Sequence, residues 1–445
     1  MDKPAISLIV VSRDRADALA IHLSCLRLQT VVNFETIVVS NLPLSEGPKP
    51  SPLIHIDCQE ANISLARNIG LQVAQGEIVV FCDDDCLPDP SFLEHIIQPF
   101  ENPTVGAAGG VTRSRNGVAT QWSAAGFGRD GLDFPVPTDR RAAYTVFPPE
   151  PDRFIKTVGT ACAFRRHALN AIGGFDPEYR YLFDETDVNL RLSEAGWSTA
   201  IVPGAQVHHG FAAGPYRNSR RVPRDLFESS ASSARFVRLH TRVSPDMAIA
   251  KHRQQLRRHA FSKFNLGLMD GKQLGFLCRR IDEGLQHGAT SKTPSPKSVS
   301  NDQMADPMPI EAQHRDHFML LGTPEKCGGL ARELVTLGKI VTVLDIQANA
   351  QPLWVRFDLD GYWHHRGGLF GQIDRKGYLV QFRSRSRYVE TECARLDKIR
   401  PVHYLLSQRK LPGRAVFLPE LAHIAAADGF NIVKLGCKAP QKVYV

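Results

Sequence analysis

The stretch EIVVFCDDDCLPDPSFLE, residues 77–94, decides the fold class of this chain. Its first part, residues 78–82, is a continuous apolar and largely β-branched run, which is typical of a strand buried on both faces of a parallel sheet. Three consecutive aspartates follow, and Asp89 before Pro90 indicates the N-cap and first residue of a helix. This order predicts an α/β sheet with a ligand site at the carboxyl ends of its strands.

The residues before this stretch repeat the same alternation of strand and helix patterns. Apolar runs at residues 6–11 and 34–40 predict two strands, and PLIHID predicts a short third. Leu65, Ile69 and Val73 recur at helical spacing and are expected to lie on one face of a helix that Gly76 ends. The alternation predicts a doubly wound, mostly parallel sheet with helices on both faces.

Length and composition indicate a cytoplasmic protein of two or three domains. The chain has 445 residues, of which 43% are apolar, and no apolar run approaches the roughly 20 residues that span a bilayer. Its N-terminus lacks the features of a signal peptide. The nine cysteines are odd in number and show no zinc-type pairing, so reduced thiols in a reducing compartment are expected.

The second half of the chain divides into three further regions. Residues 216–288 are expected to be helical and basic, since residues 217–258 hold eleven Lys or Arg against three Asp or Glu. Such a surface suits an anionic membrane, a lipid diphosphate or a nucleic acid, and a solvated helix face is the alternative. Residues 289–312 have the composition of a flexible linker. Residues 313–445 begin with a strand–helix–strand pattern and predict a small α/β accessory domain.

The aspartate triplet carries the strongest chemical signal. In an extended backbone Asp83 and Asp85 point to one side and Asp84 to the other. Two carboxylates on one side suit Mg²⁺ or Mn²⁺, which prefer oxygen ligands. An acidic surface turn after a buried strand is the alternative interpretation.

A second acidic cluster lies about a hundred residues further on. Asp184, Glu185 and Asp187 begin a helical pattern, where the helix dipole alone favours carboxylates. The functional alternative is that one of them removes a proton from an acceptor hydroxyl. His208 and His209 follow, and one neutral imidazole of such a pair can bind a metal.

Six motifs, in this order, resemble the family 2 glycosyltransferases with the GT-A fold over roughly residues 5–211. They are VSRDR, SLARNIGLQVAQGE, VVFCDDDCLPDPSFLE, GTACAFRRHALNAIGGFDPEY, FDETDVNLRLSEAGW and VPGAQVHH. The resemblance implies a catalytic domain over residues 1–215. The start of the C-terminal region is only weakly similar to the first half of a GT-B glycosyltransferase.

The resemblance also implies roles for individual residues. Asp83, Asp85 and His209 would bind the metal, and Glu185 would be the catalytic base with Asp184 and Asp187 beside it. The donor pocket would hold Ser12, Arg13, Asn41, Arg67, Asn68 and Asp84. Asn41 lies near a position where the family usually carries an aspartate that contacts the nucleotide base. The identity of the base in the donor is therefore left undecided.

The implied activity is inverting transfer of a sugar from a nucleotide-sugar donor to an acceptor hydroxyl. The donor is expected to be UDP-linked, with GDP- and dTDP-linked sugars as alternatives. The acceptor would be a surface polysaccharide, glycolipid or similar glycan, and the basic segment suits peripheral contact with an anionic membrane.

Other classes of function stay open beside this one. An inactive nucleotide-sugar- or glycan-binding relative is the main alternative. A nucleotidyltransferase should carry a Gly-rich basic loop after the first strand, and VSRDRADAL is not such a loop. No nucleic-acid partner is expected, because no aromatic stacking motif accompanies the basic segment.

Overall fold

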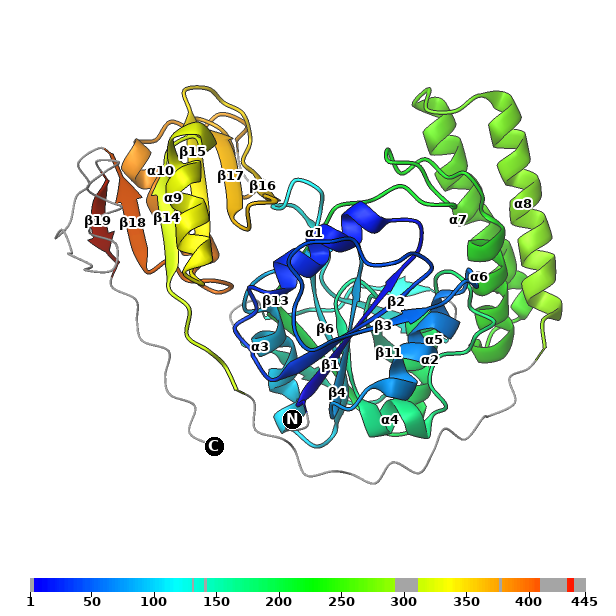
Figure 1. The fold of residues 1–445 in the computed structure, drawn as a ribbon. Coiled ribbons are helices and arrows are strands. Elements are labelled where there is room, and N and C mark those ends of the chain that lie inside the picture. Colours follow the sequence, from blue (N-terminus) through cyan, green and yellow to red (C-terminus); the bar gives the residue numbers. More distant parts are fainter. Residues whose placement is uncertain are drawn as a thin grey trace.

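The computed structural model of the chain describes residues 4–129, 132–139, 142–292, 311–375, 378–408 and 430–435 (Figure 1). It contains a large N-terminal sheet domain, a group of three helices and a smaller C-terminal sheet domain. Most of the expected linker, residues 293–310, lies outside the described residues.

The N-terminal domain is built on a ten-stranded, mostly parallel sheet with the strand order β10-β13-β6-β12-β4-β1-β2-β3. β1 to β4 run parallel, β13 runs parallel to β6, and β12 is antiparallel to β4 and β6. Two short strands complete the sheet: β5 pairs with β13, and β7 pairs with β6. The strands are β1 (Ile6–Ser12), β2 (Phe34–Ser40), β3 (Leu53–Asp57), β4 (Ile78–Asp83), β5 (Cys86–Pro88), β6 (Val105–Arg113), β7 (Thr120–Trp122), β10 (Thr145–Phe147), β12 (Cys162–Arg165) and β13 (Ser198–His209).

Helices cover both faces of this sheet, as the sequence predicts. α1 (Ala16–Leu26) and α3 (Phe92–Ile97) pack on one face, and the 3-10 helix η1 (Gln98–Glu101) follows α3. α2 (Ile63–Val73), α4 (Arg166–Ala171) and α5 (Asp184–Glu194) pack on the other. A separate three-stranded sheet contains β8 (Ala125–Gly128), β9 (Asp133–Phe134) and β11 (Arg153–Lys156). The expected GT-A arrangement is therefore confirmed.

The predicted helix is α2, and its closest contact with the sheet is made by a glycine. Leu65 and Ile69 are partly exposed and Val73 is 38% exposed, while Gly70 faces the sheet. A Cβ atom on Gly70 would lie 2.7 Å from Cγ2 of Ile9, so this helix packs too closely on β1 for a large side chain.

The predicted helix cap at Asp89 is wrong. α3 begins at Phe92 with Ser91 in the N-cap position, and no side chain caps it. The carboxylate of Asp89 is fully buried and instead accepts a hydrogen bond from Arg400 of the C-terminal domain. A distant cation has displaced the local capping interaction.

Three helices follow the N-terminal sheet domain and lie together on one side of it, drawn green in Figure 1: α6 (Phe227–His240), α7 (Pro245–Asn265) and α8 (Gly271–Thr290). Part of their positive charge is neutralised within the chain. Arg235 lies 2.6 Å from Asp176, and Arg257 lies 2.7 Å from Asp282. In the described part of the chain, no helix combines the length and the apolar character needed to cross a bilayer.

The C-terminal domain is a six-stranded sheet with the order β16-β17-β15-β14-β18-β19. Its strands are β14 (His317–Leu321), β15 (Ile340–Gln347), β16 (Trp354–Phe357), β17 (Trp363–Gly368), β18 (Tyr404–Ser407) and β19 (Asn431–Lys434). α9 (Pro324–Thr336) and α10 (Arg385–Leu396) pack with it. This domain lies on the side of the N-terminal sheet domain opposite the three helices (Figure 1).

A buried chain of charged and polar groups joins the two sheet domains. Arg400 Nη1 donates to Asp89 Oδ1 at 2.6 Å, and its Nη2 lies 2.7 Å from His365 Nε2. On one side Glu392 Oε1 lies 2.5 Å from His365 Nδ1. On the other, Asp89 Oδ2 lies 3.2 Å from His208 Nε2. The network therefore runs from Glu392 on α10 to His208 on β13. His209 is the residue after His208 and the last of β13.

Candidate active site

The three aspartates lie in a tight turn between β4 and β5. Asp84 faces the loop after β1, where its carboxylate accepts from Ser12 Oγ at 2.7 Å and from Arg15 Nη1 at 2.8 Å. Asp85 faces the loop after β13 and accepts from the backbone N–H of Ala212 at 2.7 Å. The structure thus turns Asp84 away from Asp83 and Asp85.

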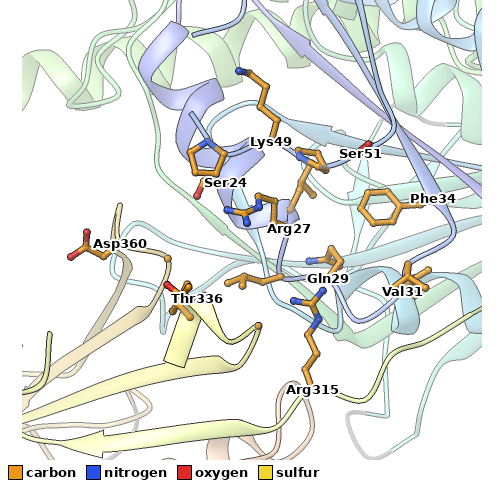
Figure 2. A pocket seen from close by; sticks show the side chains of 18 of the residues that line it. Ser24, Arg27, Gln29, Val31, Phe34, Lys49, Ser51, Arg315, Thr336 and Asp360 are labelled. Atoms are coloured by element: carbon orange, nitrogen blue, oxygen red, sulfur yellow. The ribbon is translucent and has the colours of Figure 1, made fainter. Parts of the chain in front are cut away.

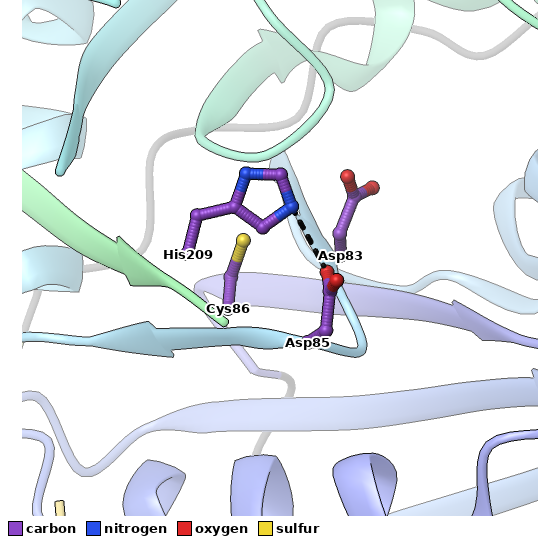
Figure 3. A group of neighbouring side chains, drawn as sticks. All are labelled: Asp83, Asp85, Cys86 and His209. Carbon is purple, nitrogen blue, oxygen red and sulfur yellow. Dashed lines mark ion pairs between the residues drawn. The ribbon is translucent and has the colours of Figure 1, made fainter. Parts of the chain in front are cut away.

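Asp83 and Asp85 form a compact cluster with Cys86 and His209 (Figure 3). Each offers one donor atom, and the four atoms lie within 4.8 Å of one another. Burial opposes ionisation of Asp85, but His209, Arg15 and the Ala212 N–H outweigh it and hold the pKa of this carboxyl at about 2. Asp85 is therefore charged at neutral pH and available to a cation.

The orientation of His209 fits a metal ligand. Its Nδ1 lies 2.9 Å from Gln121 Oε1, and that oxygen can only accept, so Nδ1 carries the proton in the neutral ring. The lone pair of Nε2 then faces Asp85 Oδ1 at 3.3 Å. Both atoms are buried without a hydrogen-bond partner. Either a proton shared with His209, the contact that helps to lower the pKa of Asp85, or a cation must lie between these two atoms. With the neutral ring it must be a cation, so these residues fit a divalent metal.

A cavity of about 170 Å³ opens beside the aspartate turn. Ser12 and Arg13 line it after β1, and Asp83 and Asp84 line it after β4. Because this is where the carboxyl ends of parallel strands meet, the cavity lies where open α/β sheets bind ligands.

The far wall of this cavity is aromatic and basic. Tyr181 and Tyr216 stack on each other with ring centroids 4.3 Å apart, and Arg180 and Arg217 flank them. The sequence analysis missed this wall. Its only local signal is a tyrosine beside an arginine in each of two loops, which is too common to single out.

Arg67 lies behind the cavity rather than in its wall. It is 3% exposed and makes a short ion pair with Asp184. Its guanidinium also lies 3.7 Å from Asp83 and 3.9 Å from Glu185. This one cation therefore joins the two acidic clusters that the sequence placed a hundred residues apart.

Two more of the residues expected in the donor pocket shape the walls without lining the cavity. Asn68 donates to the backbone oxygen of Phe175 at 2.7 Å and accepts from its N–H at 2.9 Å. Asn41 exchanges two hydrogen bonds with Asp14, at 2.7 and 3.0 Å. Asp14 has a φ of 56°, so Asn41 supports a left-handed turn in the loop after β1.

The second acidic cluster forms the first turn of α5. Leu182 and Phe183 before it have φ values of 63° and 66°, a sharp turn that brings the helix start toward Arg67. Burial first, and then Asp184, raise the pKa of Glu185 well above its ordinary value. The side chain of Glu185 is 14% exposed, against 2% for Asp184, so Glu185 is the more accessible of the two.

Asp187 has a different environment. It is buried, with one oxygen 2.7 Å from Arg191 Nε and the other 2.7 Å from His240 Nε2. Burial opposes its charge, but Arg191 and His240 outweigh this and lower the pKa of Asp187. These contacts connect α5 to α6, and both oxygens of Asp187 are engaged in them.

Residues 58–244 match the family described as "Glycosyltransferase like family 2". This region is a family 2 glycosyltransferase domain. The match contains the aspartate turn, the second acidic cluster and His209. Ser12, Arg13 and Arg15, which line the cavity, lie before it.

Relatives of the glycosyltransferase domain are distant. The chain is 26% identical over 214 residues to "Uncharacterized glycosyltransferase YwdF" of Bacillus subtilis (strain 168), covering 46% of this chain and 74% of that protein. It is 26% identical over 226 residues to "O-antigen biosynthesis protein RfbC" of Myxococcus xanthus, covering 47% of this chain but only 18% of that protein. A crystal structure of GalNAc-T7 with UDP, GalNAc and Mn²⁺ aligns with a TM-score of 0.38 and 13% identity, over 53% of this chain and 48% of that one.

Cys86 adds a sulfur atom to the metal cluster of the glycosyltransferase domain. In the sequence, Cys82 and Cys86 flank the three aspartates and show no zinc-type pairing. β5 pairs with β13 so that Cys86 lies opposite His209, which places its sulfur at the site. Thiolate ligands favour metals that are softer than Mg²⁺. We therefore expect the site to bind Co²⁺ or Zn²⁺ with the sulfur of Cys86 as a ligand.

We therefore expect Co²⁺ to give a sulfur-to-cobalt charge-transfer band with the wild-type chain and none with Cys86→Ser. Cys278→Ser is the control, because Cys278 lies on α8 and outside the four-donor cluster. Absorption titration with Co²⁺ measures both. A band that survives in Cys86→Ser would exclude sulfur ligation.

Proposed function

We propose that this chain transfers a sugar from a nucleotide-diphosphate donor to an acceptor hydroxyl by a single, inverting displacement. The observation that supports this proposal most is that the metal cluster and the cavity beside the aspartate turn share a residue. Asp83 belongs to the four-donor metal cluster and also lines the cavity that holds Ser12 and Arg13. A metal-bound diphosphate and its nucleoside would fit side by side in this arrangement.

The residues of the chain have separate tasks in this proposal. Asp83, Asp85 and His209 would hold the divalent metal, Mg²⁺ or Mn²⁺, which as a Lewis acid would neutralise charge on the leaving diphosphate. Arg13 and Arg217 offer guanidinium donors to phosphate oxygens. The stacked pair Tyr181 and Tyr216 offers an aromatic surface to the base or sugar.

Glu185 is the proposed base. As a carboxylate it takes the proton of the acceptor hydroxyl, whose oxygen attacks the anomeric carbon while the bond to the diphosphate breaks on the opposite face. One such displacement inverts the anomeric configuration. Arg67 holds Asp184 and Glu185 near Asp83, which orients the base toward the donor site.

The identity of the substrates follows less directly. The name of one relative, an O-antigen biosynthesis protein, supports a surface polysaccharide or lipid-linked glycan as acceptor. A UDP-linked donor, a cytoplasmic location and peripheral contact with an anionic membrane are predictions from the sequence.

The first test is thermal shift with nucleotide diphosphates and nucleotide sugars, each with and without Mn²⁺. We expect one nucleotide to raise the Tm only when Mn²⁺ is present, because the metal bridges the diphosphate to Asp83 and Asp85. Asp85→Asn should abolish this rise, and Asp17→Asn, at an exposed position of α1, should keep it. No rise with any nucleotide would favour the non-catalytic, glycan-binding alternative.

A further inference from the structure

A second and larger cavity, of about 490 Å³, lies between the glycosyltransferase domain and the C-terminal domain (Figure 2). The end of α1 and residues 48–51 line it on one side, and the end of α9 and residues 359–361 line it on the other. It shares no lining residue with the cavity beside the aspartate turn. Domain junctions are a common place for ligand sites of this size.

Two arginines from different parts of the chain enter this cavity. Arg27 follows α1, Arg315 precedes β14, and Figure 2 shows both guanidinium groups in the space between the domains. Within the described residues, neither guanidinium has an ion pair or a hydrogen bond. Nε of Arg315 is buried with no partner. Burial first, and then the charge of Arg27, lower the pKa of Arg315.

Nothing else in the lining neutralises these two charges. The only carboxylate among the lining residues is Asp360, and its Oδ2 accepts from Arg332 Nη1 at 3.0 Å. The nearby helix ends do not need the arginines either. Leu26 at the end of α1 accepts from the N–H of Gln29, and Val335 near the end of α9 accepts from that of Gly338. The partly buried Arg315 thus faces the exposed Arg27 with no ion pair among the described residues, and Lys49 adds a third positive charge to the lining.

We propose that this cavity binds a phosphate-bearing organic anion that bridges Arg27 and Arg315. The planar guanidinium fork matches the spacing of phosphate oxygens and binds them through two parallel hydrogen bonds. Ser24 and Ser51 in the lining add hydroxyl groups. Phe34 and Val31 give part of the lining an apolar character suited to the carbon skeleton attached to the phosphate.

Binding at this place would couple the two domains. Arg27 belongs to the glycosyltransferase domain and Arg315 to the first residues of the C-terminal region, so one anion would hold both sides. A ligand that binds only the docked arrangement stabilises it by mass action. This site uses neither the metal cluster nor the donor cavity, so it does not depend on the proposed transfer reaction.

The test is calorimetric titration of the full chain with pyrophosphate and with glycerol 3-phosphate, in EDTA so that no metal-bridged diphosphate forms at the aspartate turn. We expect the wild-type chain to bind these anions. Arg27→Gln and Arg315→Gln should each lower the affinity by about 10- to 100-fold, which is the contribution of one hydrogen bond to a charged group. Arg332→Gln, whose side chain pairs with Asp360 at the rim, should stay within about twofold. Asp85→Asn should also bind normally, which separates this site from the proposed donor site.

Phosphatidylcholine vesicles with and without phosphatidic acid distinguish the two sources of the phosphate. Arginine-dependent sedimentation with phosphatidic acid vesicles would assign the site to a lipid headgroup, and arginine-dependent binding of the soluble phosphates alone would assign it to a soluble ester. Absence of both, or equal binding by all variants, would overturn the proposal. The Tm without anion is the second readout. Removing one of two repelling cations should leave the Tm unchanged or raise it, and a clear fall in both arginine variants would show that they are structural.

Discussion

Glu185→Gln is expected to lower kcat by about 100- to 10,000-fold, the usual contribution of a positioned general base. The amide keeps the shape of the side chain but cannot accept the hydroxyl proton. Arg67 retains its contacts with Asp83 and Asp184, so the donor site should stay assembled. The measurement is kcat with the donor that the thermal-shift panel identifies, together with the Mn²⁺-dependent Tm rise, which should persist.

The pH profile adds a second criterion for the same residue. Because burial and Asp184 raise the pKa of Glu185, its carboxyl is protonated below that raised pKa and active as a base only above it. The kcat/KM of the wild-type chain should therefore rise with pH through this pKa, and the residual activity of Glu185→Gln should lack that limb. Glu194→Gln, at the other end of α5 and half-exposed, is the matched control and should behave as wild type. Near-normal turnover in Glu185→Gln would transfer the role of base to Asp184.

The parts of the fold that the sequence predicted are those with a strong local pattern. β1, β2 and β4 each contain a run of β-branched apolar residues and are almost wholly buried, since strands in the middle of a parallel sheet are covered on both faces. The aspartate turn follows directly from β4, so its position at the ligand-binding edge was also predictable. The order of six family motifs then implied the GT-A arrangement, which the structure confirms.

β6 shows why a central strand escaped prediction. Its sequence is VGAAGGVTR, which has little apolar pattern because close neighbours leave no room for side chains. A Cβ atom on Gly106 would lie 2.7 Å from Trp197, and one on Gly110 would lie 2.5 Å from the backbone oxygen of Ala205. These neighbours come from β13 and the residues before it, about ninety positions later, so the reason for the glycines is visible only after folding.

Contacts between distant segments account for the other differences at the site. Arg67 was expected in the donor pocket on the strength of its motif, but the carboxylates of Asp83, Asp184 and Glu185 draw it behind the cavity wall. Cys86 entered the metal cluster through the pairing of β5 with β13. The sequence shows an arginine and a cysteine near the site. The carboxylates around Arg67 and the strand opposite Cys86 lie too far along the chain for these contacts to be inferred.

Arg400→Met is expected to lower the free energy of unfolding by about 3–5 kcal/mol, the range for removing one partner of a buried ion pair. Asp89 would keep only His208 as a partner, and its carboxylate would stay buried without the cation that now balances it. Burial opposes the charge of Asp89, and Arg400 followed by His208 outweighs it to lower its pKa, so the loss of Arg400 acts on a charged group. His365 and the ring of Trp363, 4.3 Å from the guanidinium, lose the same neighbour.

Urea unfolding followed by both tryptophan fluorescence and circular dichroism is the measurement, because a chain of two sheet domains need not unfold in one step. Arg387→Met is the control: its pair with Glu390 on α10 is highly exposed and should contribute less than about 1 kcal/mol. The double variant Asp89→Asn with Arg400→Met should recover part of the loss, since it removes the stranded charge. Equal losses in Arg400→Met and Arg387→Met would contradict a structural role for the buried pair.

The same variant tests whether the C-terminal domain supports the glycosyltransferase site. Asp89 bonds to His208, and His208 precedes the proposed metal ligand His209 on β13. If the buried network fixes this end of β13, Arg400→Met should weaken Mn²⁺ or Co²⁺ binding as well as stability, measured on the folded chain well below the unfolding transition. Unchanged metal affinity with reduced stability would limit the network to holding the domains together. Residues 1–292 expressed alone should lose more stability than Arg400→Met, because Cys25 and Val118 also pack into the core of the C-terminal domain.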